Sequence, residues 1–522
     1  GEGGVSHIVK MGILMIAMAL ISLNFGRLGA RYGAKAGMGF AKNLRKKLFD
    51  KVQDFSFSNV DKFQTSSLIT RLTMDVTNLQ NAFMMVLRMA ARATVMAVMM
   101  NKELSVVFLI AIPVLGTVLG FILTHAHPRF VKMLGKYDDL NNSVQENLTG
   151  IRVVKAFVRE PEEIKKFGFS ADAVRKAQVF AEKLIILNGP VMQLSMYGCM
   201  IAILWFGGKM VISGTFELGQ LTSFINYIGQ ILNSLMMISM IFIMIIISRA
   251  SMTRVDEVLV EKPDLTDETA NRELKMEDGS IEFRNAAFSY SMNKENLTLS
   301  HVDFTIKPGE TIGIIGGTGS AKTTLVQLIP RLYDVLEGEV LVSGHDVKEY
   351  TLEHLRSEVA MVLQKNVLFS GSILDNLRWG KKEATREEVE EACKAAEAHD
   401  FIMSFPDGYE TQLGQGGVNV SGGQKQRLCI ARALLKKPKI IILDDSTSAV
   451  DTATDQKIRE ALRTKLAGTT TIIIAQRITS VNDADRVLVL DEGRVDAFDT
   501  PQTLLDNNEI YKEVYESQQK EA

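Results

Sequence analysis

The chain has 522 residues, of which 46% are hydrophobic and 23% are charged, and its formal net charge is −2. This length calls for more than one domain, and the near-neutral charge argues against a nucleic-acid partner, which would favour a strongly basic surface. The three cysteines, Cys199, Cys393 and Cys429, have no metal-ligand spacing and form no disulfide framework. This pattern is typical of thiols in a reducing compartment.

The first half of the chain contains stretches that are long and apolar enough to cross a bilayer. Leu184–Gly208 and Leu218–Ser248 contain no Asp, Glu, Lys or Arg. Leu104–Ala126 and the shorter Met11–Gly26 are two further candidates. One such run alone could be the buried core helix of a soluble protein, but four in one half of the chain favour a helical membrane domain.

We expect five membrane helices in this half, near residues 8–32, 78–100, 104–126, 184–212 and 218–250. The long Lys- and Arg-rich segments that follow the first and third helices are predicted to be cytoplasmic by the positive-inside rule. Five spans and a cytoplasmic C-terminal domain would put Gly1 outside, and the second span is thin after Arg92. We therefore expect that the sequence shown lacks a preceding helix and some residues near Arg92; a natural five-helix protein is the alternative.

The composition changes in the second half. We assign residues 1–255 to the membrane domain and the polar, charged stretch 256–279, which contains Pro263, to a linker. From Ser280 onward, short β-branched runs alternate with amphipathic helical patterns. Residues 280–522 are therefore predicted to form an α/β domain.

A glycine-rich loop follows the apolar strand Thr311–Ile315 and precedes the apolar run Leu325–Ile329. A strand, a glycine-rich loop and a helix are the context that a phosphate-binding P-loop requires. We expect ATP phosphates to bind along the loop, which consists of Gly316, Gly317, Thr318, Gly319, Ser320, Ala321, Lys322, Thr323 and Thr324. Lys322 would reach the β- and γ-phosphates, and the Thr323 hydroxyl would ligate Mg²⁺.

Ala321 departs from the P-loop pattern because it stands where the last glycine is expected. If this position has a positive φ, alanine costs roughly 1 kcal/mol there. We expect weakened or altered nucleotide binding, without its abolition. A laboratory substitution at this position is an alternative explanation.

Two more motifs lie further along the chain. Ser421, Gly422, Gly423 and Gln424 precede a helix-forming run, and a small hydroxyl with two glycines at a helix N-terminus makes a site for an anion. Ile440–Asp445 is an apolar strand that ends in two acids, with Asp444 placed to hold Mg²⁺ through water.

In this order and spacing the motifs of residues 280–515 resemble those of ABC ATPases. The resemblance implies that Ser421–Gln424 is the signature, which binds the γ-phosphate of a nucleotide held mainly by a second nucleotide domain. It implies that Tyr290 stacks on adenine and that Gln364 belongs to the Q-loop, which touches the metal and the transmembrane domain. Ser448–Asp451 resembles the D-loop, which assigns Asp451 to it.

The membrane half resembles the exporter-type transmembrane domain of the same superfamily. Asp61–Asp75 looks like its first intracellular coupling segment and Glu146–Lys155 like its second, with tips near 59–66 and 141–150. Two amphipathic helices that pack on their own domain are the alternative. The family has six helices, whereas five are visible here, which adds to the expectation of a missing first helix.

Two departures from the family pattern lie in one composite site. Efficient members have Glu after the strand's Asp as general base, whereas Asp445 is one methylene shorter and should hold the attacking water poorly. Gln476 stands where the family usually has His, and a neutral amide carries neither a proton nor a positive charge. A conservative swap at Asp445 and an isosteric replacement at Gln476 are the alternatives. Together the two residues favour a degenerate catalytic site.

Head-to-tail pairing, as the resemblance implies, would leave this chain's own site weak while its intact signature serves a partner's site. The expected protein is one half of a heterodimeric ABC exporter in a bacterial cytoplasmic membrane, with its nucleotide domain in the cytoplasm. It would use ATP and Mg²⁺ to move a hydrophobic small molecule, lipid or peptide outward through the bilayer. A homodimeric exporter, an ATP-binding regulatory or channel-like subunit, and an importer built on the exporter fold are the alternatives.

Overall fold

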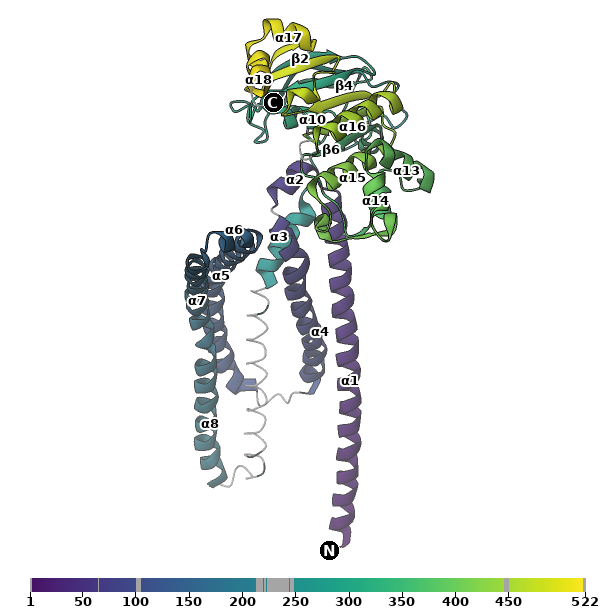
Figure 1. Cartoon of the computed structure of the whole chain (residues 1–522). Helices are drawn as coiled ribbons and strands as arrows, with labels where there is room; N and C mark the ends of the chain where they lie inside the picture. The colour runs from purple at the N-terminus through teal and green to yellow at the C-terminus, as the bar shows by residue number, and fades with distance from the viewer. Residues whose placement is uncertain are drawn as a thin grey trace. The chain divides into compact units, whose positions relative to one another are not determined.

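Figure 1 shows a computed structural model of the chain. It describes residues 2–63, 65–99, 105–212, 248–445 and 450–519, together with Gly219, Thr222 and Met244. The chain divides into two compact units, the first formed by Gly1–Asp54 and Phe63–Lys262 and the second by Phe55–Lys62 and Pro263–Ala522. The boundary at Pro263 falls inside the stretch interpreted as a linker, and a short piece of the N-terminal half belongs to the second unit.

Long helices build the first unit. They are α1 (Glu2–Gln53), α4 (Val76–Met99), α5 (Ser105–Thr149), α7 (Glu160–Ile186) and α8 (Asn188–Ile212), and residues 248–260 are also helical. Four of the expected spans lie in α1, α4, α5 and α8, while most of 218–250 lies outside the described residues. With 52 residues, α1 is about 78 Å long, far more than the roughly 30 Å of a hydrocarbon core.

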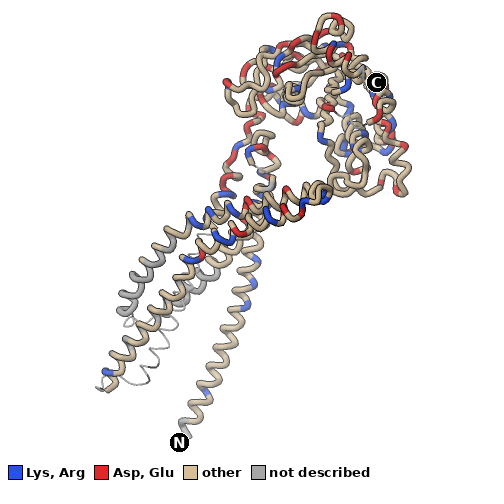
Figure 2. Tube along the Cα trace, turned by 60° about the vertical axis from the view of Figure 1, so that its left-hand side comes forward, with Lys and Arg blue, Asp and Glu red and all other residues tan. Residues whose placement is uncertain are grey.

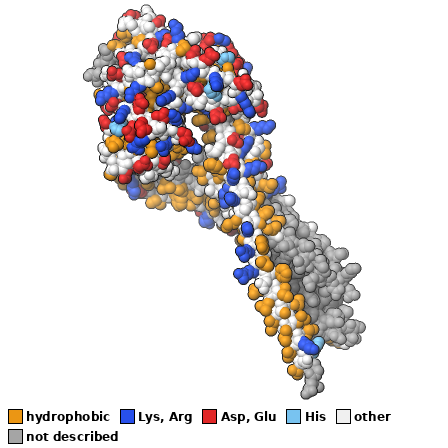
Figure 3. Space-filling model, turned by 90° about the vertical axis from the view of Figure 1, so that its right-hand side faces the viewer, with side chains coloured by type: hydrophobic (Ala, Val, Ile, Leu, Met, Phe, Trp, Pro, Cys, Tyr) orange, Lys and Arg blue, Asp and Glu red, His pale blue; other side chains and the backbone are white. Residues whose placement is uncertain are grey.

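Helix α1 exposes apolar side chains along much of its length. Among the described residues, Val5–Gln53 is the helical stretch that is long and apolar enough to cross a membrane, with a mean hydropathy of 2.1 in its most apolar window. Figure 3 shows its hydrophobic side chains, and Figure 2 shows that the same helix also carries Lys and Arg. Exposed Met15 and Phe25 would be unfavourable in water and are suited to lipid.

Short helical pieces lie at the turns between the long helices. They are α2 (Phe57–Lys62), α3 (Thr65–Thr70), the π-helix η1 (Arg71–Asp75) and α6 (Ile151–Ala156). The stretch 59–66 predicted as the first coupling tip runs from α2 into α3. The stretch 141–150 predicted as the second occupies the last turns of α5 and Gly150, where α5 ends before α6. The segment Glu146–Lys155, assigned by resemblance, spans the end of α5, Gly150 and most of α6.

A buried ion pair connects η1 to the helix of residues 248–260 in the first unit. The Asp75 carboxylate, which is fully buried, accepts hydrogen bonds from Arg254 at 2.6 Å and from Ser251 at 2.8 Å. Arg71 pairs with Glu257 at 2.9 Å and donates to the backbone carbonyl of Arg254 at 2.6 Å. These contacts fix the helix of residues 248–260 to η1, because removing one member would leave a buried charge unpaired.

The second unit is an α/β domain with a six-stranded sheet in the order β12-β11-β3-β10-β9-β6. Its strands are β3 (Thr311–Ile315), β6 (Val359–Val362), β9 (Ile440–Asp444), β10 (Thr470–Ile474), β11 (Arg486–Asp491) and β12 (Arg494–Asp499). All neighbours are parallel except β11 and β12. All residues of β9 and β10 are buried, which explains their continuous apolar sequence.

The described residues also form a smaller antiparallel sheet, in the order β2-β1-β4-β5, and the two-stranded pair β7-β8. Their bounds are β1 (Ile281–Phe288), β2 (Leu299–Ile306), β4 (Glu337–Val342), β5 (His345–Asp346), β7 (Gly371–Ser372) and β8 (Gln412–Leu413). One hydrophobic core joins this sheet to β3 and β9, and a second joins the main sheet to the helices on its other side. The sequence-based expectation of a helical domain followed by an α/β domain is confirmed.

Helices flank the sheets of the second unit. They are α10 (Lys322–Leu328), α11 (Leu352–Glu358), α12 (Ile373–Leu377), α13 (Arg386–Ala395), α14 (His399–Met403), α15 (Gly422–Leu435), α16 (Thr452–Lys465), α17 (Pro501–Asn507) and α18 (Glu509–Gln519). The described residues of this unit also form the 3₁₀ turns η3 (Gly408–Glu410), η4 (Gln415–Gly417) and η5 (Ile478–Ser480).

The loop between β3 and α10 contains one strained residue. Ala321 has φ 69° and ψ 24°, in the left-handed region, so the condition for backbone strain at this alanine is met. Gly316 (φ 153°) is different, because a Cβ there would lie 2.1 Å from the carbonyl oxygen of Leu490. The loop therefore requires glycine at 316, whereas position 321 accepts alanine at the expense of backbone strain.

We expect Ala321→Gly to raise the free energy of unfolding of the second unit by up to about 1 kcal/mol, because glycine adopts a positive φ without strain. Thermal unfolding of the full chain measures this change. Ala461→Gly is the matched control, since Ala461 lies inside α16 and its loss should destabilise the fold by about 1 kcal/mol. Destabilisation of similar size at both positions would contradict the strain at Ala321.

Candidate functional site

The carboxyl ends of three adjacent parallel strands define the candidate site. The glycine-rich loop follows β3, Asp444 ends β9, and Gln476 comes two residues after β10. In the sheet β10 lies between the other two strands, with Ile474 opposite Asp444 and Ile314. Residues far apart in the chain therefore meet at the edge where open α/β sheets bind their ligands.

Lys322 is folded into the loop that carries it. Its ammonium group donates to the carbonyls of Gly316 at 2.8 Å and Gly317 at 2.7 Å and to the Ser320 hydroxyl at 3.2 Å. Burial lowers the pKa of Lys322, and the negative charges of Asp444 and Asp445 act in the opposite direction. The loop thus concentrates one positive charge close to two carboxylates.

Asp444 is almost fully buried. Its Oδ1 accepts a hydrogen bond from the Thr323 hydroxyl at 3.1 Å, while Oδ2 is buried without a hydrogen-bond partner among the described residues. Burial is the main reason that the pKa of Asp444 is raised, and the nearby charge of Asp445 adds to the effect. A buried carboxylate oxygen without a donor is costly unless another group satisfies it.

Two amide side chains hold Asp445. Gln476 Nε2 donates to Asp445 Oδ2 at 2.7 Å, and Gln364 Nε2 lies 3.4 Å from the same oxygen. Asp445 itself is 9% exposed and has φ 47°, so the chain turns sharply as it leaves β9. The structure therefore brings together Gln364, Asp444, Asp445 and Gln476 as the sequence predicted; their chemical roles stay predictions.

Tyr290 lies in an aromatic cluster beside the loop. Its ring meets Phe288 at 4.9 Å and Tyr333 at 5.2 Å, both edge-on, and its hydroxyl lies 3.0 Å from Thr324 Oγ1. About half of the Tyr290 side chain is exposed. Such a ring offers a face to a flat ligand, in line with the predicted stacking on adenine.

Sequence reasoning missed Tyr333. Its hydroxyl donates to Asp61 Oδ2 at 2.9 Å and its ring lies 6.1 Å from that of Phe57, so it joins α2 to the aromatic cluster. Burial raises the pKa of the Tyr333 hydroxyl, with the Asp61 carboxylate as a second cause. Ser58 also donates to Asp264 at 2.6 Å. No local pattern points to these pairs, because Asp61 and Tyr333 are 272 residues apart.

Ser421–Gln424 forms the start of α15. The Ser421 hydroxyl accepts a hydrogen bond from the Gln424 backbone N–H at 3.3 Å, and Gln424 Oε1 accepts one from the Ser421 N–H at 2.9 Å. This capping box orders the turn that presents Gly422 and Gly423. Within the described part of the chain, no hydrogen bond or ion pair links this turn to the loop after β3.

Asp451 caps α16 by accepting a hydrogen bond from the Thr454 N–H at 3.0 Å. The predicted D-loop is otherwise only partly visible, because Ser448 lies outside the described residues.

Comparison with known proteins connects both units to one family. The ABC transporter transmembrane region matches residues 1–235, and the ABC transporter domain matches residues 299–448. A solved bacterial Atm1-family ABC exporter with ATP bound superposes with a TM-score of 0.83 at 26% identity, over 93% of this chain and 86% of that one.

Two sequence relatives cover nearly the whole chain. The uncharacterized ABC transporter ATP-binding protein YfiB of Bacillus subtilis is 39% identical over 521 residues, which span 98% of this chain and 90% of the relative. The ATP-dependent lipid A-core flippase of Desulfotalea psychrophila is 31% identical over 491 residues, which span 93% of this chain and 85% of the relative. With both domains fused and an exporter fold, the chain belongs to the ABC transporters and is an exporter half-transporter of the multidrug and lipid-flippase type.

Proposed function

We propose that this chain is the subunit of a heterodimeric ABC exporter that binds ATP in its own site but turns it over slowly. The observation that carries the proposal is the contact between Gln476 and Asp445 at 2.7 Å, in which two neutral amides surround the candidate base. Its intact Ser421–Gln424 turn would complete the faster site of a second half-transporter.

The chemistry is phosphoryl transfer from ATP to water, in which positioning and charge stabilisation supply most of the catalysis. Lys322 would exchange its contacts with the loop carbonyls for the β- and γ-phosphates. Backbone N–H groups of the loop would hold the same phosphates, since the loop opens α10.

Mg²⁺ fits the oxygen atoms beside the loop. The Thr323 hydroxyl and the Asp444 carboxylate are 3.1 Å apart, and Asp444 Oδ2 is the buried acceptor without a donor among the described residues. The Gln364 side-chain amide would supply a further oxygen. These are hard oxygen ligands, which Mg²⁺ combines with phosphate oxygens and water. When bound, the ion would neutralise charge on the phosphates.

Slow turnover follows from the two residues at the end of the site. The Asp445 side chain is shorter than glutamate and is 9% exposed, so its reach toward an attacking water is restricted. Gln476 donates a hydrogen bond but cannot carry the positive charge of a histidine. Both effects weaken general-base chemistry while leaving the phosphate-binding loop in place.

Two exposed apolar surfaces support assembly with a second half-transporter. In the first unit, the turn around α6 exposes Ile151, Val153, Phe157 and Val158. In the second unit, Leu363 and Val367 are exposed beside the stacked rings of Phe369 and Trp379, 4.2 Å apart. Each surface would be covered by the corresponding part of a partner, which would link ATP-driven closure of the nucleotide domains to the helices.

The transported substrate belongs to the hydrophobic or amphipathic compounds, such as a drug-like molecule, a lipid or a peptide. The similarity to a lipid A-core flippase and the apolar surface of α1 support this class. We place the protein in the bacterial cytoplasmic membrane with its nucleotide domain in the cytoplasm, and its membership of the ABC exporters supports this placement.

We expect Mg²⁺-dependent ATP binding to weaken on acidification at a pH above the ordinary range of aspartate, because the pKa of Asp444 is raised. The protonated carboxyl cannot hold the cation, so affinity is retained at higher pH and lost as pH falls. Fluorescent ATP titrations at a series of pH values measure the change. Asp444→Asn should bind weakly at every pH, and a variant that kept the wild-type pH profile would contradict the assignment.

We expect Ser421→Ala to reduce ATP hydrolysis by the heterodimer about 10-fold or more, because the turn would lose a donor to the transferring phosphate of the partner's site. Asp445→Asn should reduce ATP hydrolysis by less than about 2-fold, since the ATP site of this chain contributes little of the heterodimer's turnover. Thr385→Ala is the matched control, because Thr385 forms an equivalent capping box on α13 away from the site. Equal losses in Ser421→Ala and Asp445→Asn would point to a homodimer with two working sites.

We expect Tyr333→Phe to lower the transport obtained per ATP hydrolysed, because it removes the hydrogen bond to Asp61 and keeps the aromatic ring. Flipping of a fluorescent lipid analogue in proteoliposomes, measured beside ATP hydrolysis, reports the ratio. Tyr350→Phe is the control, since it deletes a buried tyrosine hydrogen bond to the Val342 carbonyl elsewhere in the same unit. A similar change in the ratio for both variants would argue against a coupling role of Tyr333.

A further inference from the structure

We propose that Gln518, in the last helix of the chain, is a positioning residue that holds Gln476 against Asp445. The Gln518 side-chain Nε2 donates to the backbone carbonyl of Gln476 at 2.8 Å, and its Oε1 accepts from the Ile478 N–H at 2.8 Å. One carboxamide therefore both donates and accepts on alternate residues of an extended segment, as a neighbouring β-strand would.

Helix α18 gives Gln518 a rigid base. Tyr511 is buried, and Val514 and Tyr515 pack against the hydrophobic core that contains Ile478. These residues precede Gln518 by seven, four and three positions and so lie on the same face of the helix. The helix itself is anchored at its start, where the Tyr511 N–H donates to Asn508 Oδ1 at 2.8 Å.

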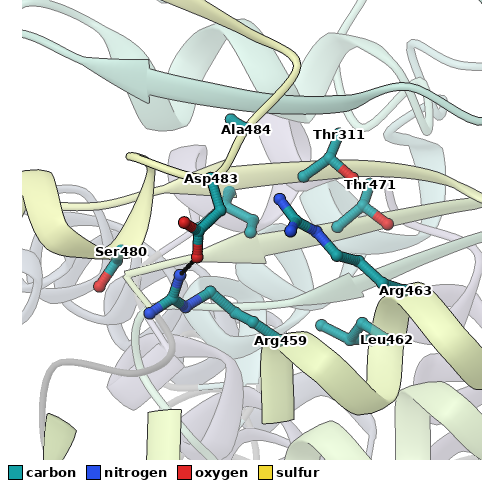
Figure 4. A pocket seen from close by; sticks show the side chains of 9 residues that line it. Thr311, Arg459, Leu462, Arg463, Thr471, Ser480, Asp483 and Ala484 are labelled. Atoms are coloured by element: carbon teal, nitrogen blue, oxygen red, sulfur yellow. Dashed lines mark hydrogen bonds and ion pairs between the residues drawn. The ribbon is translucent and has the colours of Figure 1, made fainter. Parts of the chain in front are cut away.

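Contacts with α16 hold the other end of the segment that follows Gln476. Buried Asp455 accepts hydrogen bonds from the Ser480 hydroxyl at 3.1 Å and from Arg459 Nε at 3.2 Å. Arg459 Nη1 also donates to Asp483 at 2.7 Å, the contact drawn as a dashed line in Figure 4. The segment is thus fixed from Ser480 onward, and Gln518 fixes the end nearer the ATP site.

The position of the Gln476 backbone decides where its amide points. The Gln476 side chain is exposed and donates a hydrogen bond to Asp445 at 2.7 Å. Without Gln518, the peptide units on both sides of Arg477 would exchange fixed hydrogen bonds for water and sample more orientations. Gln518 would thereby determine how well Gln476 senses the γ-phosphate. This inference rests on the role that the family resemblance gives position 476, contact with the γ-phosphate, but not on slow turnover or on a heterodimer.

The test measures nucleotide preference and does not depend on turnover. Dissociation constants for Mg²⁺–ATP and Mg²⁺–ADP are determined with the purified full-length chain in detergent. We expect Gln518→Ala to lower the preference for ATP over ADP about 3- to 10-fold, the effect of one or two lost hydrogen bonds. Gln502→Ala, an amide on neighbouring α17 that bonds only within its own helix to Asp506 in the described structure, should leave the preference unchanged.

The double variant separates positioning from general destabilisation. Because Gln518 acts through Gln476, Gln518→Ala should add no further loss in a Gln476→Ala background. An equal loss in both backgrounds, or an unchanged preference in Gln518→Ala where Gln476→Ala does lower it, would overturn the inference. If Gln476→Ala itself left the preference unchanged, the proposed role of Gln476 would fail instead.

Discussion

Parallel pairing of β3, β10 and β9 is the constraint on which the candidate site depends. Because the carboxyl ends of parallel strands meet at one edge, the loop after β3, Asp444 and Gln476 lie together although they are separate in the sequence. The buried isoleucines of these strands keep the edge rigid. The sheet thereby brings the phosphate-binding loop, Asp444 and Gln476 together at one edge.

Local sequence signals were sufficient for much of this arrangement. The glycine spacing before Lys322, the apolar run that ends in Asp444 and the cap at Ser421 each describe a backbone conformation within a few residues. The glycine pattern also marked position 321 as the place to examine for a positive φ, which the structure has there. Such features need no knowledge of which strands become neighbours.

Other contacts were beyond the reach of sequence patterns. Tyr333 and Asp61 come from opposite halves of the chain, and Gln518 meets Gln476 across 42 residues. Each contact depends on the tertiary fold. A single tyrosine or glutamine belongs to no sequence motif from which its hydrogen-bond partner could be predicted.

Helix α2 affects how the second unit can be produced and how it folds. Phe55–Lys62 belongs to the same compact unit as Pro263–Ala522, so the nucleotide-binding body is discontinuous in the gene. A protein made from Pro263 onward would leave Tyr333 without Asp61 and would expose the aromatic face that Phe57 covers. Synthesis from the N-terminus also produces α2 long before Tyr333, which α2 contacts. The second unit can therefore be completed only after most of the chain has been translated.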